Sequence, residues 1–222
     1  MRIQLVLVSC LLLASSLPWI AQAQVSSPPA APTIPTFVQQ VSRSTVGITS
    51  GRTQNQVAVG SGFVIDAENG VVLTAAHLIR DARNISVVDS SGSARHGTVV
   101  SIDERLNLAL VDVDGRFEAA LTLSSELPQI GEDAFAIGRI VDGVTPFVGR
   151  GIVSAVVRVP MDALMLSFPL ERGMSGAPVV NASGEVIGIA SVVASEQSGT
   201  LAPFGFAMPA TTLRAWLLSV DR

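Results

Sequence analysis

The fold is decided by residues 60–77, which read GSGFVIDAENGVVLTAAH. Two apolar runs, 60–66 and 71–77, are separated by Glu68-Asn69-Gly70, which is a turn signal. The pattern predicts a β-hairpin whose second strand is followed at once by His77. Short apolar runs bounded by turn residues continue from there to residue 207. Spacing of this kind is typical of an all-β sandwich or barrel.

The expected elements are mostly strands. A helix is expected at Thr36–Ser42, where Phe37, Val38 and Val41 share a face, and another at residues 209–220, which Pro209 opens. The expected strands are Thr45–Thr49, Ala58–Asp66, Val71–Thr74, Ile85–Val88, Gly97–Asp103, Leu108–Val113, Leu121–Leu123, Asp133–Ile137, Val148–Val157, Ala163–Ser167, Ala177–Asn181, Glu185–Val193 and Phe204–Ala207.

The N-terminus has the pattern of a secretory signal peptide over residues 1–23. Arg2 precedes an apolar stretch, and Ala21-Gln22-Ala23 is a small-x-small cleavage site. An uncleaved anchor and a lipoprotein box ending at Cys10 are the alternatives. Residues 24–35 form a proline-rich spacer. We therefore expect an exported protein, periplasmic or secreted, with no stable membrane insertion after cleavage.

Composition excludes two further classes of function and structure. The formal net charge is −4 and no basic cluster exists, so nothing supports nucleic-acid binding. The one cysteine, Cys10, lies in the signal peptide, so the mature chain cannot use disulfides. Stability must come from a hydrophobic core.

A second motif, Gly173-Met174-Ser175-Gly176-Ala177, places a serine between glycines. A serine becomes a nucleophile when a histidine takes its proton, and the flanking glycines let N–H groups turn toward one point. The only histidines, His77 and His96, both precede Ser175, whereas an α/β-hydrolase has its histidine after the serine. His96-Gly97-Thr98 resembles a subtilisin motif, but that fold needs helices that this chain lacks. We expect His96 to face solvent.

Taken together, these motifs resemble the trypsin-like serine proteases, and most closely their HtrA/Deg branch. Residues about 34–218 carry the resemblance. Besides the two motifs above, they include the matching segments 103–111, GEDAFAIG at 131–138, GIVSA at 151–155, GEVIGI at 184–189 and GFAMP at 205–209. The branch commonly carries a PDZ domain after the protease. Because this chain ends at Arg222, directly after the last helix, we expect no such module here.

The resemblance implies two six-stranded antiparallel Greek-key β-barrels and a C-terminal helix, with the active site between the barrels. The protease domain would span residues 36–222: an N-terminal barrel at about 36–118, a C-terminal barrel at about 119–208 and the helix at 209–220. His77 would be the general base, Ser175 the nucleophile, and the N–H groups of Gly173 and Ser175 the oxyanion hole. The resemblance also implies polypeptide substrates, a homo-oligomer (a trimer formed through the first helix), and no metal or organic cofactor.

Three departures from the family pattern matter. Ala177 stands where a second glycine is usual, and Glu171-Arg172 replace a more neutral loop before Gly173. The third and most important is Asn107, which stands where the triad aspartate is expected. An amide oxygen can accept the histidine Nδ1–H, but an amide nitrogen could instead donate to Nδ1, which leaves the proton on the wrong nitrogen. In the Ser-His-Asp triad such a change costs about 10⁴ in kcat. Of the two nearest carboxylates, Asp103 four residues earlier and Asp112 five residues later, neither is an obvious replacement.

Two functions remain open on the sequence alone. The first is an attenuated serine endopeptidase, with a substrate site lined by Leu166–Arg172 and by Ile189, Ala190, Ser191 and Val192, and with a preference for a small to medium apolar side chain before the scissile bond. The second is a catalytically inactive pseudoprotease that binds extended polypeptides by strand addition along Ile189–Val193. His77 and Ser175 favour the enzyme, and Asn107 favours the binder.

Overall fold

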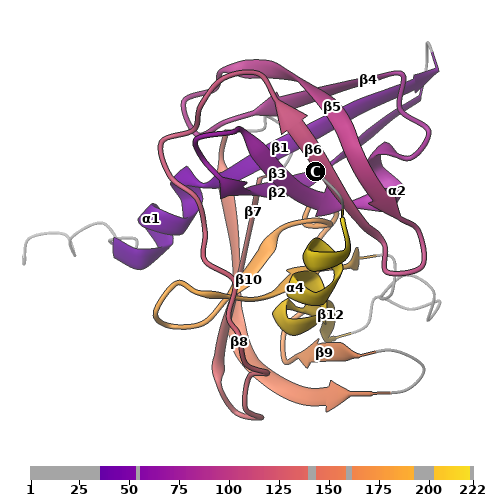
Figure 1. Ribbon diagram of the computed structural model, residues 1–222. Coiled ribbons are helices and arrows are strands. Elements are labelled where there is room, and N and C mark those ends of the chain that lie inside the picture. The colour runs from indigo at the N-terminus through magenta and orange to yellow at the C-terminus, as the bar shows by residue number, and fades with distance from the viewer. Residues whose placement is uncertain (1–35, 54–55, 140–143, 159–161, 193–202, 221–222) are drawn as a thin grey trace, which may run out of the picture. The chain divides into compact units, whose positions relative to one another are not determined.

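The computed structural model describes residues 36–53, 56–139, 144–158, 162–192 and 203–220 (Figure 1). The expected signal peptide and proline-rich spacer lie outside these residues. None of the helices in these segments combines the length and the apolarity that crossing a membrane requires.

Two closed antiparallel barrels of six strands each make up the fold, as expected (Figure 1). The first barrel has the strand order β1-β2-β3-β6-β5-β4, and the second has the order β10-β11-β12-β9-β8-β7. The strands are β1 (Thr45–Thr53), β2 (Gln56–Asp66), β3 (Val71–Ala75), β4 (Asn84–Val88), β5 (Ala94–Asp103), β6 (Leu108–Val113), β7 (Asp133–Arg139), β8 (Pro146–Val157), β9 (Ala163–Leu166), β10 (Pro178–Val180), β11 (Val186–Ala190) and β12 (Gly205–Pro209).

The alternation of side chains along the strands builds three apolar cores. In β2, Val64 points into the first barrel, while its neighbour Phe63 points outward into a core shared with the second barrel. In β7, Ala136 lies inside the second barrel and Ile137 joins the shared core. Both faces are buried at residues 60–64 of β2 and 134–139 of β7, so most positions there are apolar or glycine. The shared core holds the two barrels together.

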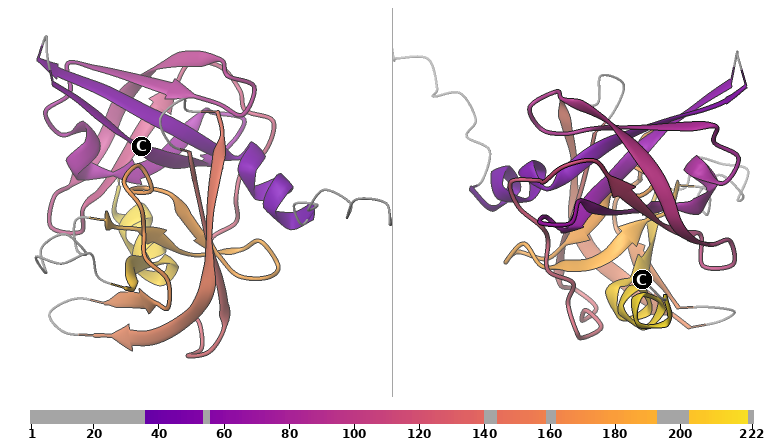
Figure 2. Two further views of the ribbon diagram at one scale, coloured as in Figure 1. Left: turned by 180° about the vertical axis from the view of Figure 1, so that it is seen from behind. Right: turned by 45° about the horizontal axis from the view of Figure 1, so that its top comes forward.

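In the described ranges, the helices α1, α2 and α4 lie outside the barrels. In α1 (Thr36–Arg43), Val38 and Val41 are buried in the shared core, and the Phe37 ring contacts Phe135 edge-on with 4.8 Å between centroids. The short α2 (Ala76–Ile79) follows β3, and α4 (Ala210–Ser219) buries Leu213 and Trp216 in the shared core. Figure 2 shows α1 and α4 from two further directions. The apolar face of α1 is thus used within the chain.

The prediction of a strand at Leu121–Leu123 is wrong. This segment connects the barrels and forms only an isolated bridge between Leu123 and Val186. Its N–H and C=O groups bind both barrels instead: the N–H of Leu121 donates to the carbonyl of Val64, and the N–H of Val186 donates to that of Thr122. Since each barrel is already closed by its own strands, no edge is left for this segment to extend. The strand expected at Glu185–Val193 ends earlier, at Ala190.

Candidate active site

His77 lies in the first turn of α2, immediately beyond the buried strand β3. The first N–H groups of a helix have no partner within the helix and need acceptors from elsewhere. Ala75, the N-cap residue, has an extended backbone and no side chain that could accept. The acceptors must therefore come from another part of the chain.

Asn107 supplies them, although it lies 30 residues away from His77 in the sequence. Its backbone carbonyl accepts from the N–H of Ala76 at 3.1 Å, and its side-chain Oδ1 accepts from the N–H of His77 at 3.0 Å. Asn107 closes a turn in which its own N–H donates to the carbonyl of Glu104, and it adopts a φ of 57°. Asparagine is one of the few residues other than glycine that tolerate this left-handed conformation. The turn before β6 thereby caps α2.

The same Oδ1 atom lies 3.0 Å from Nδ1 of the His77 ring. A backbone N–H can only donate, so the contact with the His77 N–H requires the oxygen of the Asn107 amide to face His77. Rotating the amide would bring its NH₂ group against that N–H, donor against donor. With Oδ1 facing the ring, Nδ1 carries the proton and Nε2 is left as an acceptor. The arrangement in which the amide donates to Nδ1 is therefore disfavoured.

Ser175 lies in a tightly turned loop that precedes β10. The N–H of Met174 donates to the carbonyl of Glu171, and that of Ala177 donates to the carbonyl of Met174. Gly173 and Gly176 have φ values of 94° and 83°, which a side chain would strain. Met174 is fully buried and anchors the loop in the core of the second barrel. The glycines around Ser175 thus permit the tight turn that their pattern in the sequence predicts.

The loop of Ser175 packs directly against the strands that lead to His77. The N–H of Ser61 in β2 donates to the carbonyl of Ser175 at 2.8 Å. A Cβ atom added to Gly176 would lie 2.2 Å from the carbonyl oxygen of Ser61 and 3.1 Å from the N atom of Ala75. Ala75 is two residues from His77, so the structure brings the two motifs together across the barrel interface.

Two N–H groups of the loop are those of the expected oxyanion hole. Within the described part of the chain, neither Gly173 nor Ser175 donates its N–H to any protein acceptor. The Ser175 hydroxyl likewise has no partner among these residues, so its hydrogen bond to His77 is not formed in this state. Catalytic hydrogen bonds are often long before substrate binds.

Much of the backbone of residues 189–192, the segment expected to bind substrate, already forms hydrogen bonds within the protein. Ile189 lies in β11, which pairs with β10 on one side and with β12 on the other. The N–H of Ala190 donates to the carbonyl of Ala177, and its carbonyl accepts from Gly176. The expectation of strand addition along the whole segment is therefore wrong for Ile189 and Ala190, because their edges are already occupied. The N–H of Ser191 is engaged as well, since it donates to the carbonyl of Phe206 at 2.9 Å.

The other candidate groups lie elsewhere or are engaged. The Asp103 carboxylate accepts from the N–H of Leu106 at 2.8 Å and so closes its own turn. His96 is exposed on β5, as expected, and Asp112 is exposed on β6. One residue that sequence reasoning passed over is Ser61, whose signal was the Gly60-Ser61-Gly62 motif itself.

Comparison with known proteins agrees with this geometry. A model of the trypsin-like peptidase domain matches residues 60–189. Periplasmic serine endoprotease DegP of Escherichia coli strain K12 is 31% identical over 172 residues, which cover 74% of this chain and 36% of the relative. Serine protease HTRA1 of Xenopus tropicalis is 32% identical over 176 residues, which cover 72% and 35% respectively. The chain thus spans about a third of the length of these relatives. By its sequence and its two barrels, it belongs to the trypsin-like peptidase domain family, with homology to the DegP/HtrA serine proteases.

Proposed function

We propose that this chain is an exported serine endopeptidase in which Ser175 is the nucleophile and His77 the general base. Ser175 Oγ would attack the peptide carbonyl while its proton passes to Nε2 of His77. The N–H groups of Gly173 and Ser175 would bind the negative charge that develops on the carbonyl oxygen. The C–N bond then breaks as His77 returns the proton to the leaving amine, and water hydrolyses the acyl-enzyme by the reverse sequence.

The observation that carries this proposal is the 3.0 Å contact between Nδ1 of His77 and Oδ1 of Asn107. It places the proton on Nδ1 and leaves Nε2 unprotonated, which is the property that a base needs to accept the Ser175 proton. Asn107 then orients His77 as an aspartate would, but carries no charge to stabilise the imidazolium. A neutral acceptor forms a hydrogen bond about half as strong as a charged one. The substitution attenuates the base without disabling it.

The same argument revises the expected gain from restoring the aspartate. The loss of about 10⁴ in the Ser-His-Asp triad arises from the wrong tautomer. Here the tautomer is correct, so only the charge is missing, and Asn107→Asp should raise kcat/KM by about 10- to 100-fold.

The descriptions of the relatives support the class of substrate and the location of the protein. The relatives named above are described as proteases, which supports polypeptide substrates, and the Escherichia coli relative is described as periplasmic. Leu170 and Val192 are buried beside the loop in the core of the second barrel, which supports a small to medium apolar side chain before the scissile bond. If a homotrimer forms, surfaces other than the buried face of α1 must carry it.

A second candidate function is a pseudoprotease that binds extended polypeptide without cleaving it. The neutral Asn107 favours this reading, since it removes the charge that normally stabilises the imidazolium. Among the described residues, pairing would then involve the backbone of Ser191 and Val192, which follow the end of β11.

One experiment separates the two functions. Casein cleavage and labelling by a fluorophosphonate are measured for the chain from residue 24 onward, for Ser175→Ala and for Asn107→Asp. The enzyme requires Ser175→Ala to abolish both signals, and Asn107→Asp to raise both. The carboxylate introduced by Asn107→Asp would also favour the protonated imidazole, so the acid limb of the pH–rate profile of that variant should move to higher pH. If no variant is labelled and none cleaves casein, only the binding function survives.

A further inference from the structure

Ser61 holds both ends of the tripeptide that carries the proposed oxyanion donors. Its hydroxyl donates to the carbonyl of Gly173 at 2.7 Å, and its backbone N–H donates to the carbonyl of Ser175 at 2.8 Å. The residue is completely buried in β2, which belongs to the first barrel, whereas the tripeptide belongs to the second. A single residue thus holds the peptide group between Gly173 and Met174 and the one between Ser175 and Gly176.

The hydroxyl of Ser61 has one hydrogen, and its neighbours decide where that hydrogen goes. The N–H of Arg139 donates to Oγ at 2.9 Å, so this contact uses a lone pair. Of the two carbonyls within reach, that of Gly173 at 2.7 Å is closer than that of Arg139 at 3.2 Å. The hydroxyl therefore accepts from Arg139 and donates to Gly173. Gly138 permits this approach, because a Cβ atom there would lie 3.0 Å from Oγ.

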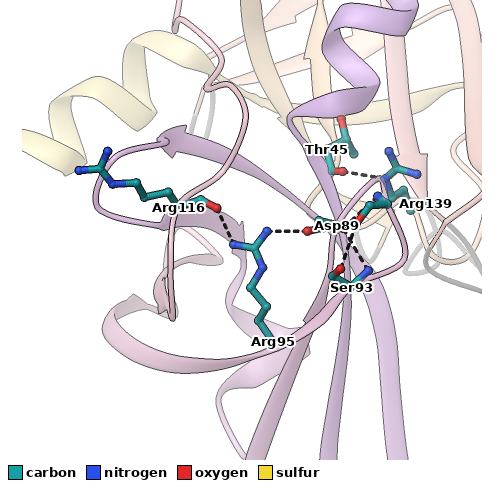
Figure 3. Close-up of polar contacts among 7 residues, drawn as sticks. Thr45, Asp89, Ser93, Arg95, Arg116 and Arg139 are labelled. Atoms are coloured by element: carbon teal, nitrogen blue, oxygen red, sulfur yellow. Dashed lines mark hydrogen bonds and ion pairs between the residues drawn. The ribbon is translucent and has the colours of Figure 1, made fainter.

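Arg139 is itself fixed to the start of the domain. Its side chain is almost fully buried, with 2% of the residue exposed. Nε donates to the carbonyl of Thr45 at 2.7 Å (Figure 3), and the two terminal nitrogens donate to the carbonyls of Ser42 and Val144. The guanidinium group thereby ties the end of β7 to the junction between α1 and β1. A planar group with five donors suits several carbonyls at once.

We propose that Ser61 is a positioning residue for the oxyanion loop, and that Arg139 anchors it to the junction of α1 and β1. This inference rests on the proposed function of Ser175. The hydroxyl holds the Gly173 carbonyl and so limits rotation of the peptide group between Gly173 and Met174. The loop then presents the N–H groups of Gly173 and Ser175 in one arrangement before substrate arrives. Preorganised donors of this kind stabilise the transition state more than the bound substrate.

The test compares Ser61→Ala with Ser44→Ala. Ser44 is also buried, and its hydroxyl is without a hydrogen-bond partner in the described residues, so the control removes the same atom from a core without breaking a bond. Three quantities are measured: the rate of Ser175 labelling by a fluorophosphonate, kcat and KM on casein-derived peptides, and hydrogen exchange in peptides covering residues 171–177.

Ser61→Ala should lower the labelling rate and kcat by about 10- to 100-fold, leave KM nearly unchanged, and speed exchange at residues 171–177. Ser44→Ala should change none of these. Equal kcat in Ser61→Ala and the unchanged protein would overturn the inference, as would a fall in kcat matched by an equal rise in KM.

If Ser61→Ala does not fold, Arg139→Lys provides a second variant. It keeps the charge and every backbone contact to Ser61, but loses the fork that binds several carbonyls together. Its exchange at residues 171–177 should rise, and its kcat should fall by a smaller factor than that of Ser61→Ala. Unchanged exchange and kcat would exclude the anchoring role. If Ser175 is unlabelled in every protein, the proposed function fails, and hydrogen exchange alone then decides whether Ser61 holds the loop.

Discussion

The proposed base and the proposed nucleophile of this chain are held in different ways. His77 is oriented by Asn107, and both residues belong to the first barrel. The loop of Ser175 belongs to the second barrel, but Ser61 of the first barrel fixes it. The first arrangement depends on the folding of one barrel, and the second depends on the packing of two. Damage to one should therefore be separable from damage to the other.

The largest effect is expected from Asn107→Ala. Alanine cannot accept from His77, and a φ of 57° costs it about 1–2 kcal/mol. Activity should fall by about 10³-fold because the tautomer and the orientation of His77 are both lost. The free energy of unfolding should fall by about 2–3 kcal/mol, which adds the lost cap of α2. Peptide cleavage and chemical denaturation measure the two losses.

Asn107→Ala should leave the loop at residues 171–177 intact, because Asn107 holds His77 and not Ser175. Hydrogen exchange at residues 171–177 should match that of the unchanged protein, because no contact of Ser61 is altered. Faster exchange in this segment would show that the two arrangements are coupled after all.

Gly176→Ala should damage the docking of the loop instead. Its Cβ would clash with the backbone of Ser61 at 2.2 Å, and backbone cannot move aside easily. Activity should fall by about 100-fold, since a displacement of about 1 Å at a reacting group has this effect. Exchange at residues 171–177 should rise.

Gly131→Ala is the matched control for this change. Gly131 has a φ of 93°, similar to the 83° of Gly176, but a Cβ there would meet nothing within 4 Å. Both variants should lose about 1–2 kcal/mol from backbone strain. Only Gly176→Ala should lose activity. Equal activity in the two variants would contradict the role of the barrel contact.

A smaller effect is expected at Asp89, in the turn between β4 and β5. Burial, the largest single influence, raises the pKa of this carboxyl, but hydrogen bonds from Ser91, Arg95 and the N–H groups of Ser91 and Ser93 together lower it below 3.8. Figure 3 shows the contacts with Ser93 and Arg95. Because the pKa of Asp89 is lower in the folded protein than in the unfolded chain, its ionised carboxylate stabilises the fold when the pH lies above the pKa of the unfolded chain. This contribution is lost as the pH falls through the pKa of the folded protein.

Asp89→Asn should therefore reduce the free energy of unfolding by about 1–2 kcal/mol at pH 7. The difference from the unchanged protein should shrink as the pH falls below about 3.8. Denaturation at pH 7 and pH 3 measures it. Activity at pH 7 should not change, because the turn contacts neither arrangement. A difference that grew in acid would refute the assignment.

The smallest effect is expected from His96→Gln. This side chain is exposed on β5, so the free energy of unfolding should change by less than about 0.5 kcal/mol. Casein cleavage should also stay within about twofold. A large loss of activity would mean that His77 is not the only base.

The sequence predicted most of the fold because the apolar runs and turn residues are local signals. Residues 60–77 specify a hairpin regardless of what surrounds them, and the strand found at Leu108–Val113 has the expected bounds. The strand at Leu121–Leu123 failed because apolar residues there serve the core between the barrels, and no local pattern distinguishes that use.

The candidate residues of the site could be chosen from the sequence, but the hydrogen bonds that hold them in place could not. His77 and Ser175 stand in recognisable motifs, whereas the orientation of the Asn107 amide depends on an N–H group 30 residues away. The role of Ser61 depends on contacts to residues 78 and 112 positions away. Such pairings follow from the closure and packing of the barrels, which spacing along the chain does not encode.

The buried guanidinium of Arg139 sets the minimal fragment that can be expressed as a working domain. A fragment beginning at Thr45 would remove the Ser42 carbonyl that accepts from it, and would strip Val38 and Val41 from the core. A donor left unpaired in the interior destabilises the fold. Residues 36–43 are therefore part of the domain, and truncation trials should start at or before Thr36.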